Sequence, residues 1–120
     1  MKVLLLNGSP HEKGCTYTAL REVADTLEKE GVETEIFWIG NQAVRGCIGC
    51  GGCAKSGTRR CVFKDDRVNE ALDKMLECDG LVVGSPVHYA AAGGSITSFL
   101  DRMFYAGGSQ LRTKVGAAVV

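Results

Sequence analysis

Four cysteines lie close together in the middle of the chain, at Cys47, Cys50, Cys53 and Cys61. This C-x2-C-x2-C spacing with a later fourth thiol allows the sulfurs to converge, because the glycines between them let the backbone turn tightly. Compact cysteine loops of this kind bind [4Fe–4S] clusters, whereas a structural zinc site more often combines two separate C-x2-C pairs. The spacing favours a cluster over zinc, and free or redox-active thiols remain the alternative.

Charged and cysteine residues outside this quartet have simpler expected roles. Arg59 and Arg60 precede Cys61, where they would offset the negative charge of a thiolate-ligated cluster or simply face solvent. Cys78 follows an apolar helical pattern and is expected to pack at a helix end.

A second stretch whose residues could bind a ligand follows the first expected strand. That strand, residues 3–6, is apolar enough to be buried on both faces. A polar loop then leads into a helix start, where backbone N–H groups and the helix dipole attract anions. The loop matches neither a triphosphate-binding loop, since Gly14 replaces the lysine, nor a dinucleotide fingerprint. It predicts a site for one monophosphate, held by hydrogen bonds from Ser9, Thr16 and Tyr17. The alternative is an ordinary turn in which Thr16 caps the helix.

Composition narrows the class of protein. The 14 basic and 14 acidic residues balance, so charge indicates neither nucleic acid nor an anionic membrane as a partner. No apolar run approaches the ~20 residues of a membrane span, and the apolar stretch near Met1 is too short for a signal peptide. The sequence therefore predicts a cytoplasmic protein, in which six cysteines favour metal or redox chemistry over disulfides.

The apolar periodicity predicts strands that alternate with helices. Strands are expected at 3–6, 33–39, 80–84 and 114–120, and helices at 16–30, from Asp65-Asp66 onward and at 94–105. Such alternation is typical of a doubly wound α/β domain with a parallel sheet, right-handed crossovers and helices on both faces. Ligands of such sheets bind beyond the carboxyl ends of the strands, which places the loops after the first and third strands at one site.

The predicted domain organisation is a single domain over residues 1–120, with residues 40–64 as an irregular cysteine-rich insertion. The last strand, 114–120, is apolar and would expose an unpaired edge, which proteins normally avoid. We therefore expect the domain to be incomplete at its C-terminal end, or another segment to pair with this edge.

Three stretches resemble one family. Asn7-Gly8-Ser9-Pro10 with Gly14-Cys15-Thr16 is similar to a G-S-P-R-x-x-G-N-T loop, although His11 replaces the arginine and Cys15 the asparagine. Ser85-Pro86-Val87-His88-Tyr89 and Phe99-Leu100-Asp101-Arg102 are similar to an S-P-V-Y-x loop and an F-x-D-R helix. With the cysteine segment, these motifs resemble the NAD(P)H-dependent FMN reductases and iron–sulfur flavoproteins of the flavodoxin-like superfold.

The resemblance implies a fold and a set of cofactor contacts. It implies a flavodoxin-like sheet of order 2-1-3-4, with the family's fifth strand missing. The FMN phosphate would contact the first loop, and the isoalloxazine ring the second; the implied residues are Ser9, His11, Gly14, Cys15, Thr16 and Tyr17, then Ser85, Pro86, Val87, His88, Tyr89 and Ala90. Tyr89 as a packing aromatic and His88 as a solvent-facing residue remain alternatives. Asp101 and Arg102 are expected to form a structural pair that fixes the helix against a loop.

The resemblance also implies a function. The expected protein is an FMN-dependent oxidoreductase that passes electrons between NAD(P)H, or a ferredoxin-like donor, and a small acceptor such as a quinone or flavin. The flavin carries the chemistry, so no catalytic side chain is expected, and the [4Fe–4S] cluster would relay electrons. The alternative is a flavodoxin-like electron carrier without turnover of its own. The family's members usually form homodimers or homotetramers. A phosphorylation-receiver fold is disfavoured, since Asn7-Gly8-Ser9 lacks the acidic metal-binding cluster.

Overall fold

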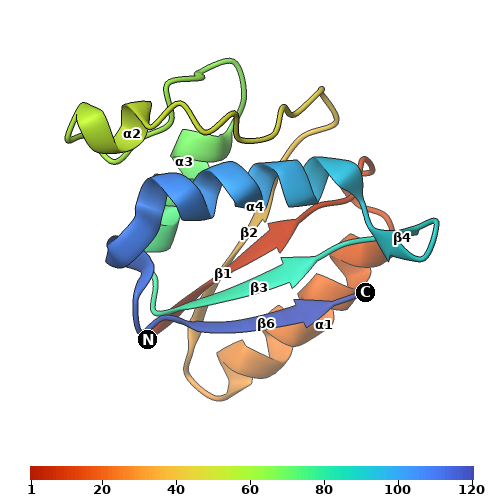
Figure 1. Cartoon of the computed structure of the whole chain (residues 1–120). Coiled ribbons are helices and arrows are strands. Elements are labelled where there is room, and N and C mark those ends of the chain that lie inside the picture. The colour runs from red at the N-terminus through yellow and green to blue at the C-terminus, as the bar shows by residue number, and fades with distance from the viewer.

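A four-stranded parallel sheet forms the centre of the computed structural model, which describes residues 1–120, and helices cover both of its faces (Figure 1). The strands lie in the order β2-β1-β3-β6, as predicted. Their bounds are Lys2–Asn7 for β1, Glu33–Trp38 for β2, Gly80–Gly84 for β3 and Val115–Val119 for β6. The longer helices are α1 at Cys15–Lys29, α3 at Val68–Leu76 and α4 at Gly94–Gly107.

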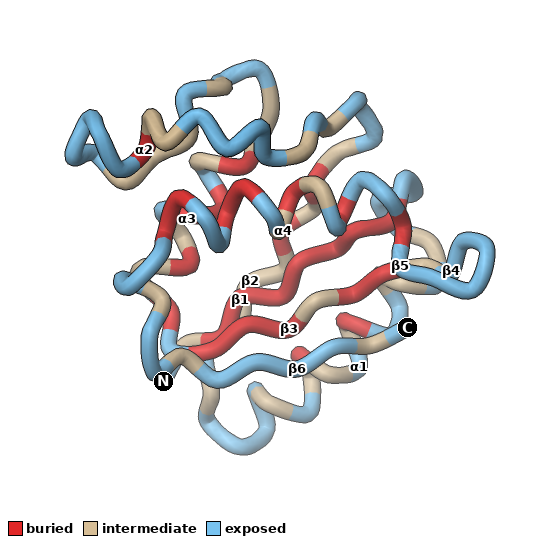
Figure 2. Tube along the Cα trace, viewed as in Figure 1, coloured by how far each residue is buried: buried red, intermediate tan, exposed pale blue.

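Alternate residues of β1 build two cores on opposite faces of the sheet. Leu4 and Leu6 pack with α3 and α4, whereas Val3 and Leu5 pack with α1. Leu4, Leu5 and Leu6 are fully buried, and each such burial stabilises the fold by about 1.5–3 kcal/mol. Figure 2 shows that β1 is buried along most of its length. Because both faces are covered, β1 must be apolar throughout, which confirms the prediction from its sequence.

Two predicted irregular segments contain regular structure. The cysteine-rich segment holds a short helix, α2 at Gly52–Lys55, and the loop after β3 forms a hairpin of β4 at Val87–His88 and β5 at Ala91–Ala92. The expectation of purely irregular loops was wrong at both places. Elements this short lack a periodicity that a sequence pattern can detect.

Helix boundaries differ slightly from the prediction. Helix α3 begins at Val68 rather than at the two aspartates, and the Asp66 carboxylate accepts a hydrogen bond from the Val68 N–H at 3.1 Å. Helix α4 extends to Gly107, after which a 3-10 turn, η1 at Gly108–Leu111, leads toward β6. None of the helices has the length and apolarity needed to cross a membrane.

The carboxyl ends of β1 and β3 lie side by side, as the sequence predicted. Asn7 is in register with Gly84, and the Gly8 N–H donates to the Gly84 carbonyl at 2.9 Å. A Cβ at Gly8 would lie 2.6 Å from Ile96 Cβ and 2.8 Å from that carbonyl oxygen, so the two loops meet only because position 8 has no side chain.

A Gly8→Ala substitution should therefore destabilise the protein by about 1–3 kcal/mol, since the packed neighbours must shift to admit a methyl group. The measurement is the free energy of unfolding in urea. Gly94→Ala is the matched control, because no atom lies within 4 Å of a Cβ there, and it should leave stability unchanged or raise it. Equal stabilities for the two variants would contradict the close approach.

Candidate functional site

The loop between β1 and α1 is held in shape by buried polar contacts. The Asn7 side chain is fully buried, donates to the Glu12 carbonyl at 2.8 Å and accepts the Ser9 N–H at 3.0 Å. Ser9 Oγ accepts the His11 N–H at 3.1 Å, and Trp38 Nε1 donates to the Ser9 carbonyl at 2.8 Å. The loop is thus preformed, with help from β2 that the sequence did not predict.

Helix α1 starts without a side-chain cap. Gly14 is its N-cap residue, and no protein atom accepts a hydrogen bond from the N–H groups of Cys15, Thr16 or Tyr17. The first turn also carries no acidic residue. The alternative in which Thr16 caps the helix is wrong, since Thr16 lies inside it. Free N–H groups at the positive end of a helix dipole can bind an anion.

The second loop is closed at its base by Ser85. Its N–H donates to the Val119 carbonyl at 3.1 Å, and its buried hydroxyl accepts the Gly93 N–H at 2.9 Å while donating to the Pro86 carbonyl at 2.8 Å. The hydroxyl is therefore occupied in holding the hairpin together. Its structural role was not part of the sequence prediction.

The tip of the hairpin is strained and exposed. Tyr89 and Ala90 both have positive φ, at 52° and 64°, in a conformation that usually requires glycine or asparagine. The Tyr89 side chain is fully exposed, and the hairpin stands out from the body of the molecule at the right of Figure 1. Such strained non-glycine residues cluster at functional sites.

The two loops share one pocket. It lies between the first turn of α1, the start of the second loop and the end of β6, and its lining is Cys15, Thr16, Ala19, Ser85, Pro86, Val119 and Val120. The structure thus brings together Cys15 and Thr16 of the predicted phosphate contacts with Ser85 and Pro86 of the predicted ring contacts.

The other predicted cofactor residues lie around this pocket rather than in its wall. Ser9 is buried in the first loop, and His11 is exposed beside Gly14. The Tyr17 ring lines a separate polar hollow beside β2, with Lys13 Nζ 5.3 Å from the ring centre. The remaining four, Val87, His88, Tyr89 and Ala90, are exposed on the hairpin.

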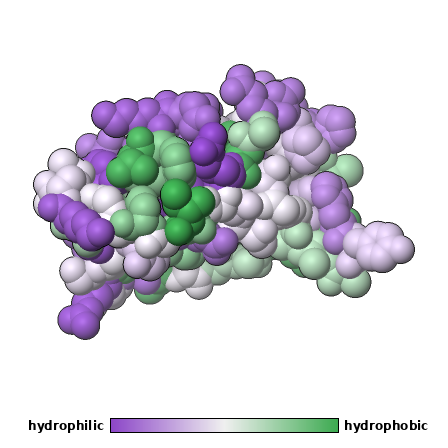
Figure 3. Space-filling view, turned by 45° about the horizontal axis from the view of Figure 1, so that its top comes forward, coloured by the Kyte–Doolittle hydropathy of each residue, from purple (hydrophilic) through white to green (hydrophobic).

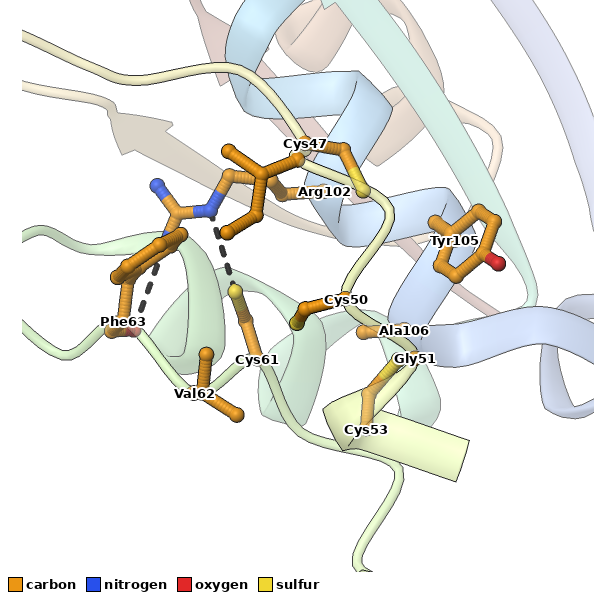
Figure 4. A pocket seen from close by; sticks show the side chains of 11 residues that line it. Cys47, Cys50, Gly51, Cys53, Cys61, Val62, Phe63, Arg102, Tyr105 and Ala106 are labelled. Atoms are coloured by element: carbon orange, nitrogen blue, oxygen red, sulfur yellow. Dashed lines mark hydrogen bonds between the residues drawn. The ribbon is translucent and has the colours of Figure 1, made fainter. Parts of the chain in front are cut away.

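All four cysteines of the predicted quartet line a second pocket (Figure 4). Cys47 and Cys50 are exposed, Cys53 is buried and Cys61 is half-buried. The rest of the lining is mostly apolar and contains no carboxylate; it consists of Ile48, Gly51, Val62, Phe63, Arg102, Tyr105 and Ala106. Figure 3 shows apolar side chains at the surface of this side of the molecule, bordered by hydrophilic ones.

The donor chemistry suits an iron–sulfur cluster, although the thiols are spread around the pocket. In this arrangement of the loop, no three His, Cys, Asp or Glu side chains are close enough together to hold a metal ion. Two sulfurs already accept backbone hydrogen bonds, Cys47 from the Gly49 N–H at 3.4 Å and Cys50 from the Gly52 N–H at 3.5 Å. Gly49 also has positive φ, which lets the backbone turn around this point.

Cys61 is held by two helices. The Asn69 side chain of α3 accepts the Cys61 N–H at 2.8 Å and donates to the Cys61 carbonyl at 2.9 Å. From α4, Arg102 Nε donates to the Cys61 sulfur at 3.2 Å (Figure 4). Neither Asn69 nor this role of Arg102 was predicted from the sequence.

The expected pairing of Arg102 with Asp101 is wrong, because the structure gives Arg102 a different partner. Asp101 is exposed, whereas the buried Arg102 guanidinium pairs with Asp66, which lies just before α3. Burial alone would lower the pKa of Arg102, but hydrogen bonds to Asp66 and Cys61 outweigh it and the pKa is raised. Arg102 does fix α4 against a loop, as expected, but its partner is distant in the sequence because helix geometry turns the adjacent Asp101 to a different side.

The two arginines before Cys61 have other partners in the structure. Arg60 forms an ion pair with Asp73, and Arg59 packs against Gly108. Cys78, by contrast, packs as predicted: it is buried after α3, and burial raises the pKa of its thiol.

Comparison with known proteins agrees with these observations. The model of the NADPH-dependent FMN reductase family matches residues 1–120. An iron–sulfur flavoprotein of Methanocaldococcus jannaschii is 39% identical over 120 residues, which are 99% of this chain and 61% of that protein. An iron–sulfur flavoprotein of Archaeoglobus fulgidus is 35% identical over 122 residues, which cover this chain completely and 58% of that protein. The chain thus spans about three fifths of the length of these relatives.

Solved structures support the fold. RosB with bound 8-demethyl-8-formylriboflavin-5′-phosphate has a TM-score of 0.73 at 20% identity, over 98% of this chain and 50% of that one. The NAD(P)H:quinone oxidoreductase from Methanothermobacter marburgensis has a TM-score of 0.69 at 17% identity, over 100% of this chain and 64% of that one. With its flavodoxin-like sheet and its match along the whole sequence, the chain belongs to the NADPH-dependent FMN reductase family.

Proposed function

We propose that the chain binds FMN across the loops that follow β1 and β3. The observation that carries this proposal is the shared pocket, in which the uncapped start of α1 and the Ser85-Pro86 turn face one another. The N–H groups of Cys15, Thr16 and Tyr17 would hold the phosphate, and Pro86 with the hairpin would flank the ring. An anion site and an apolar turn at one sheet edge match the two halves of FMN.

The chain's own residues would then bind and orient the cofactor. When bound, FMN supplies hydride and electron transfer, so the protein needs no acid or base of its own. Asn7 and Trp38 keep the phosphate loop in shape, and Ser85 keeps the hairpin closed beside the ring. The proposed reaction passes electrons between NAD(P)H, or a ferredoxin-like donor, and a small acceptor such as a quinone or flavin.

Thr16→Glu should weaken FMN binding by at least about tenfold, because a carboxylate would stand next to the phosphate and like charges a few ångströms apart cost on the order of 1 kcal/mol or more. Fluorescence titration with FMN measures the dissociation constant. Thr26→Glu adds the same charge on an exposed site farther along α1 and should leave it unchanged.

Riboflavin, which lacks the phosphate, provides a second control for the same variants. Its affinity should not fall in Thr16→Glu. Equal FMN affinity in both charge variants would contradict a phosphate site at the start of α1.

We further propose that Cys47, Cys50, Cys53 and Cys61 hold a [4Fe–4S] cluster. The support is their common pocket, its apolar lining, the N–H groups directed at two of the sulfurs, and relatives that are named iron–sulfur flavoproteins. The cluster would exchange electrons with FMN. Free thiols are the competing assignment.

Replacing any one of the four cysteines by alanine should reduce the iron bound per chain after anaerobic reconstitution by more than half, because the cluster loses one of its four thiolate ligands. Iron and sulfide analysis with a visible spectrum measures this. Cys78→Ala, which removes a buried thiol outside the pocket, should retain full iron. A wild-type protein that takes up no iron and sulfide would contradict the cluster.

Steady-state oxidation of NADPH or NADH separates an enzyme from an electron carrier. FMN-loaded protein should oxidise the nicotinamide continuously when a quinone is supplied, and at limiting FMN the rate of Thr16→Glu should fall in proportion to the FMN it no longer binds. Reduction of a single equivalent without turnover would favour the carrier.

A further inference from the structure

We propose that Arg102 is a positioning residue for the cysteine pocket: it fixes the Cys61 sulfur and raises the reduction potential of an iron–sulfur cluster bound there. The inference rests on the proposed cluster, and it assigns a specific physical task to one side chain that does not ligate the metal.

The guanidinium of Arg102 is completely enclosed. Its side chain is 1% exposed and that of its partner Asp66 is 6% exposed, so both members of this ion pair are buried. Besides Cys61, its donors reach the Asp66 carboxylate and the carbonyls of Phe63 at 3.3 Å and Arg45 at 3.4 Å. A group bound on every side cannot rotate away, so its Nε–H stays directed at the sulfur (Figure 4).

Cys61 is accordingly the member of the quartet that is bonded to the long helices of the domain, whereas the buried Cys53 belongs to the short helix α2 of the cysteine segment itself. The backbone of Cys61 is clamped by Asn69 and its sulfur by Arg102, from two different helices of the same face. Cys47 and Cys50 lie exposed on the loop and receive hydrogen bonds only from that loop's own backbone. A cluster would therefore assemble against Cys61, with the loop closing toward it.

The same contact should tune the electron affinity of the site. Reduction adds negative charge to a cluster, and hydrogen bonds to its sulfurs together with nearby positive charge favour the reduced form. Asp66 offsets part of the Arg102 charge, but its oxygens face the two Nη atoms and leave Nε–H for the sulfur. Loss of this donor should lower the cluster's midpoint potential.

Two variants test this on cluster-loaded protein. Arg102→Lys keeps the positive charge but loses the planar guanidinium and its Nε–H donor. The double variant Arg102→Met with Asp66→Asn removes the ion pair without leaving a buried charge behind. The amide oxygen introduced by Asp66→Asn could still accept the Val68 N–H, so the start of α3 is preserved. The matched controls make the same changes one residue from Cys61, in the more exposed Arg60–Asp73 pair: Arg60→Lys, and Arg60→Met with Asp73→Asn.

Redox titration under anaerobic conditions, followed by visible absorbance and electron paramagnetic resonance, gives the midpoint potential of each protein. We expect it to shift to lower values in the double variant, to shift less in Arg102→Lys, and to equal the wild-type value in both controls. Thermal unfolding identifies a variant that has lost its fold, and then the other Arg102 variant carries the comparison.

The outcomes separate the two proposals. Wild-type potentials in iron-loaded Arg102 variants would overturn the positioning role and leave the cluster intact. Equal shifts in the Arg60 controls would also overturn it, since the effect would then be general charge or fold disturbance. A wild-type chain without a cluster after reconstitution would overturn the proposed cluster and this inference together.

Discussion

The parallel pairing of β1 with β3 is the constraint on which the rest of the site depends. It places Asn7 beside Gly84, so that the chain leaves both strands at the same sheet edge and the Gly8 N–H bonds the Gly84 carbonyl. At this point the strand order reverses, since β2 lies beyond β1 and β6 beyond β3. A crevice opens there because the two connections diverge to opposite faces of the sheet.

Helix α4 runs from the proposed FMN site to the cysteine pocket. Its first residues follow the hairpin, whose base is closed by the Ser85–Gly93 bond, and its later turns carry Arg102, Tyr105 and Ala106 into the pocket wall. The two proposed redox sites therefore share a rigid element. A rigid helix between them rises about 1.5 Å per residue, so nine residues from Gly93 to Arg102 span about 13 Å.

Much of the fold could be predicted from the sequence because its signals are strong and local. The run Leu4-Leu5-Leu6 indicates a strand buried on both faces, and the stripe that includes Leu20 and Ala24 indicates a helix, as the structure confirms. The hairpin and α2 could not be predicted because two-residue strands and a four-residue helix have no measurable period.

The polar contacts that hold the two sites in shape could not be predicted for another reason. Trp38 with Ser9, and Arg102 with Asp66, are contacts between residues far apart in the sequence, which only the assembled topology brings together.

The most direct test that FMN bridges the loops after β1 and β3 is to follow the backbone amide chemical shifts of isotope-labelled protein during titration with FMN. The amides of Cys15, Thr16 and Tyr17 and those of the β4–β5 hairpin should shift together and saturate at one equivalent, because one molecule would touch both loops. Riboflavin should move the hairpin signals while leaving the α1 signals nearly in place. Shifts confined to one loop, or centred on the polar hollow beside β2, would contradict a cofactor that bridges the carboxyl ends of β1 and β3.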